Sequence, residues 1–128
     1  MADSFFLSLL VSLAFNLAFT LIIEVGMAMV MGVWEHEDLK AVVKVNCITN
    51  PIVVILMNLS FELSQSITVR NLVTAVLEIV VVWVETVMYR RWLVHRKRKM
   101  FLLSLVLNVS SFGIGVVFCI ILSTWGEL

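Results

Sequence analysis

The chain has 128 residues, of which 62% are hydrophobic and 14% are charged, and its mean hydropathy is +1.09. A soluble globular domain is about 45–50% apolar and about 25% charged. The composition therefore excludes a water-soluble globular protein, a disordered tail, a disulfide-stapled secreted module and a nucleic-acid-binding protein. Nine Lys or Arg balance nine Asp or Glu. We expect a single membrane domain covering residues 1–128, with the lipid bilayer as its main partner.

Four apolar stretches are long enough to cross a bilayer, whose hydrocarbon core of about 30 Å needs about 20 helical residues. Each stretch is too long for a strand, and none alternates apolar with polar residues as a β-barrel strand does. The expected helices cover residues 5–33, 41–60, 69–93 and 100–124. Short connections make consecutive helices antiparallel neighbours. The sequence therefore predicts an all-α polytopic membrane protein, built as a four-helix bundle.

Eight of the nine basic residues lie on one side of this predicted bundle. Lys40 and Lys44 lie at the first connection and six more lie within 90–99, whereas Arg70 alone lies on the opposite side. The positive-inside rule predicts that loops 34–40 and 90–99 are cytoplasmic and that both termini are outside the cytoplasmic membrane. Four residues near the predicted membrane boundaries are typical of an aromatic belt: Trp34, Tyr89, Trp92 and Trp125.

Three glutamates lie inside the predicted helices. Glu24 and Glu85 each lie about ten residues, or roughly 15 Å, from the cytoplasmic end of the helix. Glu78 lies two turns from Glu85 on the same helix face. A charge at the bilayer centre costs roughly 2.5–3.5 kcal/mol, and no basic residue lies inside a predicted span. Three explanations remain: a bound proton, hydrogen bonds from Asn, Ser or Thr side chains, or a bound cation.

Polar side chains at a matching depth of the second and fourth predicted helices complete a candidate ion- or substrate-binding site with the three glutamates. They are Asn46, Thr49, Asn50, Asn108 and Ser111. Carboxylate, amide and hydroxyl oxygens suit a proton, Na⁺, Ca²⁺ or Mg²⁺ rather than zinc or copper, and no other cofactor is expected. If a metal cation binds, Glu24 and Glu85 are its expected ligands. Alternatively, the Asn, Thr and Ser side chains join helices by hydrogen bonds worth about 0.6 kcal/mol each.

Both halves of the chain contain a glutamate followed, about 22 residues later, by Asn-x-x-(Thr/Ser)-x-(Pro/Gly). The pattern joins Glu24 to segment 46–51 and Glu85 to segment 108–113. It predicts two tandem helical hairpins related by a pseudo-twofold axis along the membrane normal, a parallel repeat. Chance similarity between apolar helices is the alternative. Because a small translocation pathway is usually surrounded by more than four helices, we expect a homodimer.

Segment 46–51 reads Asn-Cys-Ile-Thr-Asn-Pro and is framed by Glu24, Glu85 and the pair Asn108-x-x-Ser111. In this arrangement the chain resembles small uncharacterised four-helix bacterial integral membrane proteins, over most of its length. The resemblance implies no known activity. Small multidrug resistance transporters match in size and in having a glutamate in the first helix. In this chain, however, the glutamate lies late in that helix, and the duplicated Glu/Asn pattern is not theirs.

These features predict a protein that binds or translocates a cation, or a proton-coupled small solute, through buried Glu/Asn sites. The alternative is a non-catalytic subunit or assembly partner of a larger membrane complex, fastened to it by its polar stripes. A third alternative is an intramembrane enzyme that uses Glu24 and Glu85 as acid and base. No catalytic residue is assigned, because no span contains His and the chain lacks HExxH, GxSxG and CxxC motifs.

Overall fold

The computed structural model describes residues 2–94 and 99–127, which form four α-helices with no strand among them. The helices are α1 (Ala2–Val30), α2 (His36–Leu63), α3 (Ile67–Trp92) and α4 (Met100–Gly126). Each of them is long and apolar enough to cross a membrane. The predicted all-α fold with four spans is therefore confirmed, and the chain is an integral membrane protein.

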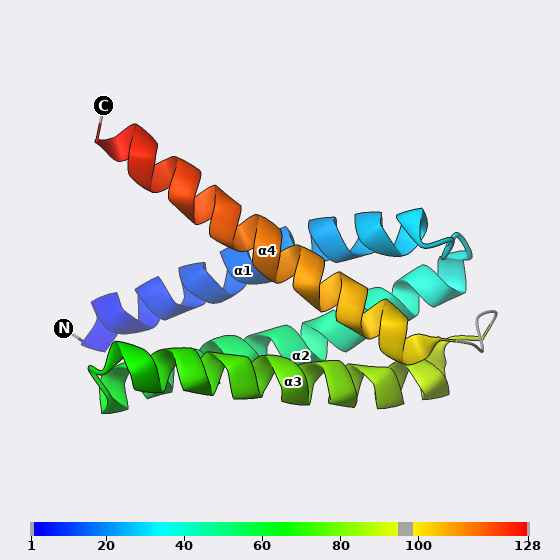
Figure 1. The fold of residues 1–128 in the computed structure, drawn as a ribbon, viewed down its shortest axis with the longest axis horizontal. Coiled ribbons are helices and arrows are strands. Elements are labelled where there is room, and N and C mark those ends of the chain that lie inside the picture. Colours follow the sequence, from blue (N-terminus) through cyan, green and yellow to red (C-terminus); the bar gives the residue numbers. More distant parts are fainter. Residues whose placement is uncertain (1, 95–98, 128) are drawn as a thin grey trace.

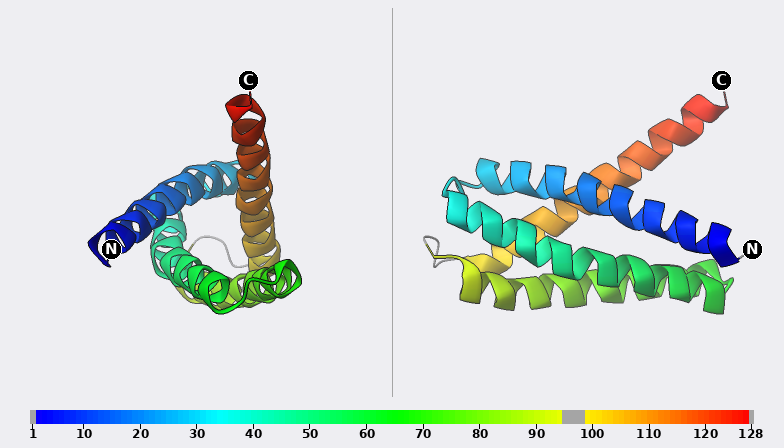
Figure 2. Two further views of the ribbon diagram at one scale, coloured as in Figure 1. Left: turned by 90° about the vertical axis from the view of Figure 1, so that its left-hand side faces the viewer. Right: turned by 180° about the vertical axis from the view of Figure 1, so that it is seen from behind.

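The four helices pack in chain order around a common axis (Figure 1). Within the described residues α1 packs against α2 and α4, and α3 packs against the same two helices. The diagonal pairs, α1 with α3 and α2 with α4, do not pack against each other. Figure 2 shows this arrangement from one end of the bundle. Side chains from all four helices therefore point into a shared interior.

α1 ends at Val30, three residues before the predicted end, although the apolar sequence continues. Gly32 has a φ of 89°, a left-handed conformation that glycine adopts without a steric penalty. Its N–H donates to the oxygen of Met29 (3.0 Å), and the N–H of Val33 donates to the oxygen of Ala28 (2.9 Å). These two bonds form a Schellman motif, which satisfies the last carbonyls of the helix. The motif therefore ends α1 at Val30, although the apolar sequence continues beyond that residue.

α2 begins at His36, five residues before the predicted start, so most of the predicted loop 34–40 is helical. Glu37 and Asp38 lie in the first turn, where negatively charged side chains stabilise a helix through its dipole. Asp38 is only 1% exposed, and its Oδ1 accepts a hydrogen bond from the backbone N–H of Val94 (2.8 Å). Asp38 thus ties the start of α2 to the segment after α3.

The remaining helix ends lie within three residues of those predicted. The connection between α2 and α3 is only residues 64–66, and α4 begins at Met100 as predicted. The predicted loop 90–99 begins after Trp92, because α3 continues to that residue. Residues 95–98 of this loop lie outside the described part of the chain.

Burial is confined to one half of the bundle. The first buried residue described in α1 is Glu24, and the last one in α4 is Asn108. We name the end with connections 31–35 and 93–99 the core end, and the opposite end the open end. At the open end α4 leans away from the other helices (Figure 1). One apolar cluster fills the core end: Ala28, Val33, Ala41, Val42, Val45, Tyr89, Leu93, Met100, Leu103 and Leu107.

Candidate functional site

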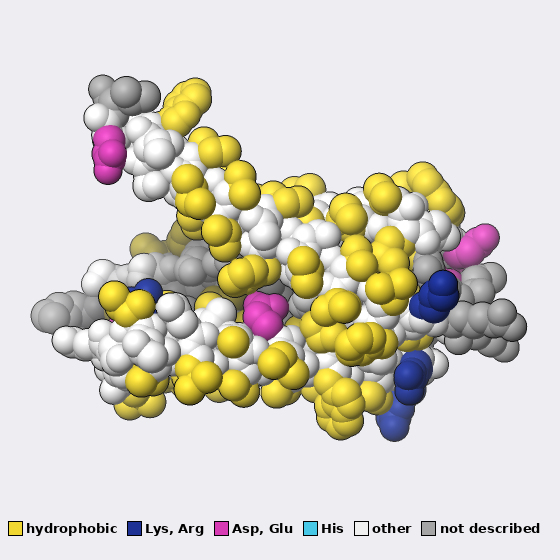
Figure 3. All heavy atoms as spheres, in the orientation of Figure 1, with side chains coloured by type: hydrophobic (Ala, Val, Ile, Leu, Met, Phe, Trp, Pro, Cys, Tyr) yellow, Lys and Arg dark blue, Asp and Glu magenta, His cyan; other side chains and the backbone are white. Residues whose placement is uncertain are grey.

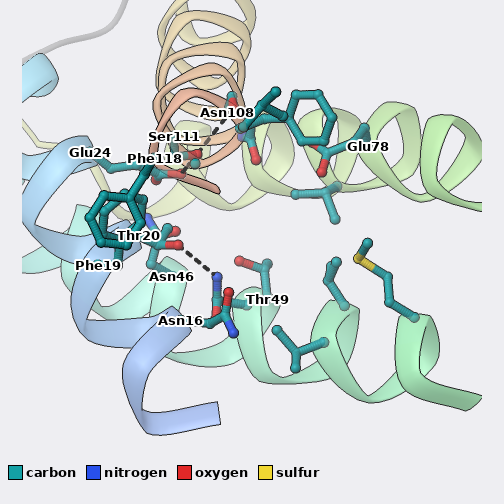
Figure 4. A pocket seen from close by; sticks show the side chains of 18 of the residues that line it. Asn16, Phe19, Thr20, Glu24, Asn46, Thr49, Glu78, Asn108, Ser111 and Phe118 are labelled. Atoms are coloured by element: carbon teal, nitrogen blue, oxygen red, sulfur yellow. Dashed lines mark hydrogen bonds between the residues drawn. The ribbon is translucent and has the colours of Figure 1, made fainter. Parts of the chain in front are cut away.

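A cavity of about 590 Å³ lies between the four helices, and each helix contributes to its lining. Residues toward the open end, among them Phe15, Met57 and Ser123, line one part of it. All eight residues predicted from the sequence line it as well: Glu24, Asn46, Thr49, Asn50, Glu78, Glu85, Asn108 and Ser111. Figure 4 shows most of these side chains converging from different helices on one space.

Glu85 on α3 is 1% exposed, and both of its carboxylate oxygens accept hydrogen bonds. Oε1 accepts from Thr49 Oγ1 on α2 at 2.8 Å. Oε2 accepts from two groups on α4, Ser104 Oγ at 3.2 Å and Asn108 Nδ2 at 2.5 Å. Three donors from two neighbouring helices satisfy much of the hydrogen-bonding capacity of this carboxylate. Glu85 therefore joins α2, α3 and α4.

Glu24 on α1 is buried to the same degree, at 1% exposed, but it has fewer donors. Its Oε1 accepts a hydrogen bond from Ser111 Oγ on α4 at 3.0 Å. The amide of Asn46 lies beside the carboxylate but is turned toward the backbone oxygen of Val42, 3.1 Å from its nitrogen. Oε2 is buried with no hydrogen-bond partner among the described residues. Because such an oxygen is costly, Glu24 is the carboxylate that a proton or cation would stabilise most.

Each glutamate takes a hydroxyl donor from the other half of the chain. Glu24 in α1 accepts from Ser111 in α4, and Glu85 in α3 accepts from Thr49 in α2. Each glutamate also lies beside an asparagine of the helix that follows it in the chain, Asn46 for the first and Asn108 for the second. The two halves therefore surround their glutamates with the same types of side chain.

Glu85 has two donors that Glu24 lacks, the amide of Asn108 and the hydroxyl of Ser104. The amides of Asn46 and Asn108 each bond the backbone oxygen four residues earlier, at Val42 and Ser104. The Ser104 hydroxyl also donates to Glu85. Valine at the corresponding place offers no donor, so the glutamate of α1 lacks the contact that its counterpart on α3 has.

Asn50 supplies a second unpaired oxygen in the cavity. Its Nδ2 donates to Thr20 Oγ1 at 3.0 Å, which links α2 to α1 (Figure 4). Its Oδ1 is buried and has no hydrogen-bond partner among the described residues. Amide oxygens bind hard cations and accept hydrogen bonds from protonated groups. Asn50 and Glu24 therefore offer acceptors that the protein itself leaves unused.

Glu78 lies further toward the open end and is only half-buried. It lines the central cavity and also a second cavity of about 500 Å³ between α3 and α4, together with Asn71 and Thr74. Figure 3 shows an acidic side chain on the otherwise apolar face between these two helices. Glu78 therefore lies where the interior meets the surface that faces lipid.

The cavity is acidic and has no cation of its own, since none of the described residues lining it is Lys, Arg or His. Among the described residues, no three His, Cys, Asp or Glu side chains are arranged to hold a metal ion. Glu85 already accepts three hydrogen bonds, whereas Glu24 retains an unused oxygen. The two glutamates therefore differ in the number of acceptor positions that remain for a ligand.

Tyr89 does not lie in an aromatic belt, and that interpretation of the sequence is wrong. Its side chain is 0% exposed, it lies beside Asn46, and its hydroxyl has no hydrogen-bond partner among the described residues. The available signal was its spacing: Tyr89 follows Glu85 by four residues and so shares its helix face. The three tryptophans assigned to the belt are exposed: Trp34, Trp92 and Trp125.

The chain matches no protein-family model, no curated protein and no solved structure. A four-helix bundle by itself supports many unrelated functions. The function therefore has to be inferred from the cavity and from the side chains that line it.

Proposed function

We propose that the protein binds a cation, or a proton-coupled small solute, at Glu24 and translocates it across the membrane. The observation that carries this proposal is the unpaired Oε2 of a glutamate that is 1% exposed and lines a cavity without any basic residue among those described. An uncompensated carboxylate in a membrane interior is costly. A visiting proton or cation removes that cost, and the cavity gives it a way to arrive.

The remaining polar residues have two roles in this proposal. Asn50 supplies a neutral oxygen in the cavity that the binding carboxylate lines, and Ser111 holds that carboxylate in place. Glu85, with its three donors, is the structural counterpart that fixes α2, α3 and α4 around the site. Glu78 is a second acidic contact nearer the open end.

We infer that the two hairpins, α1–α2 and α3–α4, are parallel repeats related by a pseudo-twofold axis along the membrane normal. Exchanging them maps the Ser111–Glu24 contact onto the Thr49–Glu85 contact, and the helix pair α2/α3 onto α4/α1. Many transporters bind substrate at the interface between such repeats. The cavity lies at the corresponding interface of this bundle.

The described arrangement gives the site access from one side only. The apolar cluster at the core end lies between the glutamates and connections 31–35 and 93–99. Glu24 is six residues from the end of α1, or about 9 Å at about 1.5 Å per residue, rather than the predicted 15 Å. Translocation therefore requires the apolar cluster at the core end to open, since the cavity already extends toward the open end.

The orientation that we propose follows from the basic residues. Lys40, Lys44, Arg90 and Arg91 all belong to the core-end halves of α2 and α3, whereas Arg70 belongs to the other end of α3. By the positive-inside rule the core end is cytoplasmic, in the cytoplasmic membrane, and the open end with both termini is outside. The cavity then admits its ligand from outside the cell.

Labelling with dicyclohexylcarbodiimide tests the proposal in reconstituted vesicles. The reagent takes the proton of a carboxylic acid, bonds its central carbon to the carboxyl oxygen, and rearranges to an N-acylurea that retains the whole reagent mass. We expect mass spectrometry to find the adduct on Glu24, with labelling slowed by a bound cation. Na⁺, Ca²⁺, Mg²⁺ and protons (as pH) are the probes.

Two variants control this experiment. Glu24→Gln should abolish the protected adduct and the cation-dependent proton or ion flux of the vesicles. Glu62→Gln, at an exposed site near the end of α2, should change neither. Unchanged binding and flux after both Glu24→Gln and Glu85→Gln, in protein that retains its helicity, would overturn the proposal.

A second candidate is a non-transporting subunit that assembles with another membrane protein. The outer part of α4 favours it, because no described residue after Asn108 in that helix is buried. A stoichiometric partner that co-purifies, together with an absence of flux from the isolated chain, would support this function. A homodimer, detected by native mass spectrometry, would instead supply the extra walls of a translocation pathway.

A further inference from the structure

The cavity is larger than a bare ion needs. Its volume of about 590 Å³ falls within the range of about 300–1,000 Å³ typical of sites for organic molecules. Most of its lining is apolar, and the fully buried polar atoms without a hydrogen-bond partner, among the described residues that line it, are Glu24 Oε2 and Asn50 Oδ1. A ligand that fills this space therefore needs an apolar body and a small polar or charged part.

Aromatic rings line the same cavity. Phe15 on α1 stacks with Phe118 on α4, with ring centroids 6.4 Å apart, and the ring of Phe19 on α1 lies tilted against Phe118, with centroids 5.5 Å apart. Phe15 and Phe19 are 6.1 Å apart. We name these three residues the aromatic wall. Figure 4 shows two of them, Phe19 and Phe118, in the lining of the cavity that Glu24 and Ser111 also line.

The aromatic wall contacts the backbone of α4 at a glycine. The ring of Phe19 lies against Gly115 of α4, where a Cβ would come to 3.8 Å from Cε1 of the ring. The ring therefore bridges α1 and α4. Since the faces of aromatic rings attract cations within about 6 Å, the wall and the Glu24 carboxylate favour the same charge.

We propose that the ligand of this cavity is a lipophilic organic cation, whose charged centre meets Glu24 and whose apolar body packs against the aromatic wall. The proposal rests on the function proposed above, because it uses Glu24 as the binding carboxylate, and it adds the chemical class of the ligand. The neutral oxygen of Asn50 supplies a further contact to the charged centre.

Two probes of equal shape and opposite charge test this class of ligand. Tetraphenylphosphonium is a lipophilic cation, and tetraphenylborate is its anionic counterpart. The full-length protein is placed in lipid nanodiscs, and binding is measured by equilibrium dialysis after subtracting that of empty nanodiscs. We expect saturable binding of the phosphonium and none of the borate. Equal binding of both ions, or of neither, would overturn the proposal.

Two variants locate the binding. Phe19→Leu keeps an apolar side chain but removes the ring, so the phosphonium should bind about threefold to thirtyfold more weakly, the range of a cation–π contact. Phe6→Leu removes an exposed ring of the same helix outside the cavity and should leave binding unchanged. Glu24→Gln should weaken binding about thirtyfold or more, whereas Glu62→Gln should not change it.

The results separate this inference from the function on which it rests. If Phe19→Leu binds phosphonium as tightly as Phe6→Leu, or if the phosphonium does not protect Glu24 from the carbodiimide while a small inorganic cation does, only the class of ligand is wrong. If neither kind of cation protects Glu24, and Glu24→Gln and Glu85→Gln leave binding and flux unchanged, both proposals fail. Wild-type selectivity between phosphonium and borate stays informative even if a variant does not fold.

Discussion

Glu24 and Glu85 have similar positions in their helices and the same 1% exposure, but Glu85 accepts three side-chain hydrogen bonds and Glu24 accepts one. The sequence alone predicts that both are buried without a basic partner, because no basic residue lies in the spans. Which of them is satisfied depends on contacts across the bundle, such as Thr49 to Glu85, which no spacing within one helix reveals. Ser104 was a recognisable signal, since it lies four residues before Asn108 and so shares its face.

The two glutamates should therefore differ in their contribution to stability. Glu85→Ala removes an acceptor of three side-chain hydrogen bonds that join α2, α3 and α4, and it leaves their donors with backbone acceptors alone. We expect it to lower the free energy of unfolding by about 2–5 kcal/mol. Glu24→Ala removes one accepted hydrogen bond and one unpaired oxygen, so its loss should be smaller by at least about 1 kcal/mol. Thermal unfolding in detergent, followed by circular dichroism, measures both. Equal losses would contradict the assigned roles.

A hydroxyl at position 42 should give Glu24 a hydrogen-bond donor like the one that Ser104 gives Glu85. Val42 corresponds to Ser104, because each provides the backbone oxygen that the following asparagine binds. In Val42→Ser the new hydroxyl can donate to Glu24, and we expect cation protection from carbodiimide to weaken about tenfold. Val42→Ala is the matched control, since it loses similar volume without adding a donor. A similar loss in both variants would mean that packing, not the donor, is responsible.

At the scale of the helices, hydropathy predicts the existence of each element better than its ends. The apolar run continues past Val30, so it predicts a longer α1, and only Gly32 shows where the chain turns. The polar residues before position 41 suggest a loop, but Asp38 is buried against the backbone of Val94 and α2 begins earlier. Both differences arise from local hydrogen bonds, which hydropathy does not measure.

Two glycine substitutions test the end of α1. Gly32→Ala places a Cβ at a φ of 89°, which should cost about 1–2 kcal/mol of stability. Gly26→Ala lies in the interior of the same helix with no atom within 4 Å of the added Cβ, and it should stabilise by about 0.5–1 kcal/mol. The midpoint temperatures of thermal unfolding of the two variants should therefore shift in opposite directions from that of the wild type. A neutral Gly32→Ala would argue against the Schellman motif.

At the scale of the whole molecule, the division into a packed core end and an open end could not be predicted. Lipid tails are as apolar as leucine, so an apolar helix such as α4 carries little information about which part of it packs on protein. The sequence does indicate which residues meet, because the eight predicted polar residues all line one cavity. It does not indicate the size of the cavity or the aromatic wall, since phenylalanines in a membrane helix suit lipid equally well.

Thiol labelling tests the orientation of the whole molecule. In a Cys47→Ser, Cys119→Ser background, Gln65→Cys in connection 64–66 should react with a membrane-impermeant maleimide on intact cells. Glu35→Cys in connection 31–35 should react only after permeabilisation, because we expect the core end to be cytoplasmic. Both sites are exposed and connect helices. Reversed labelling would place the cavity mouth on the cytoplasmic side.

The lengths of α1 and α4 have a consequence for how the bilayer acts on this protein. With 29 and 27 residues they measure about 44 and 40 Å, well beyond a hydrocarbon core of about 30 Å. Such hydrophobic mismatch is relieved by tilt, and α4 already leans away from the other helices at the open end. Thicker membranes would draw the helices upright and narrow the mouth, whereas thinner ones would spread it. Acyl-chain length, varied across a series of phosphatidylcholines, then becomes a means of adjusting ligand access without any mutation.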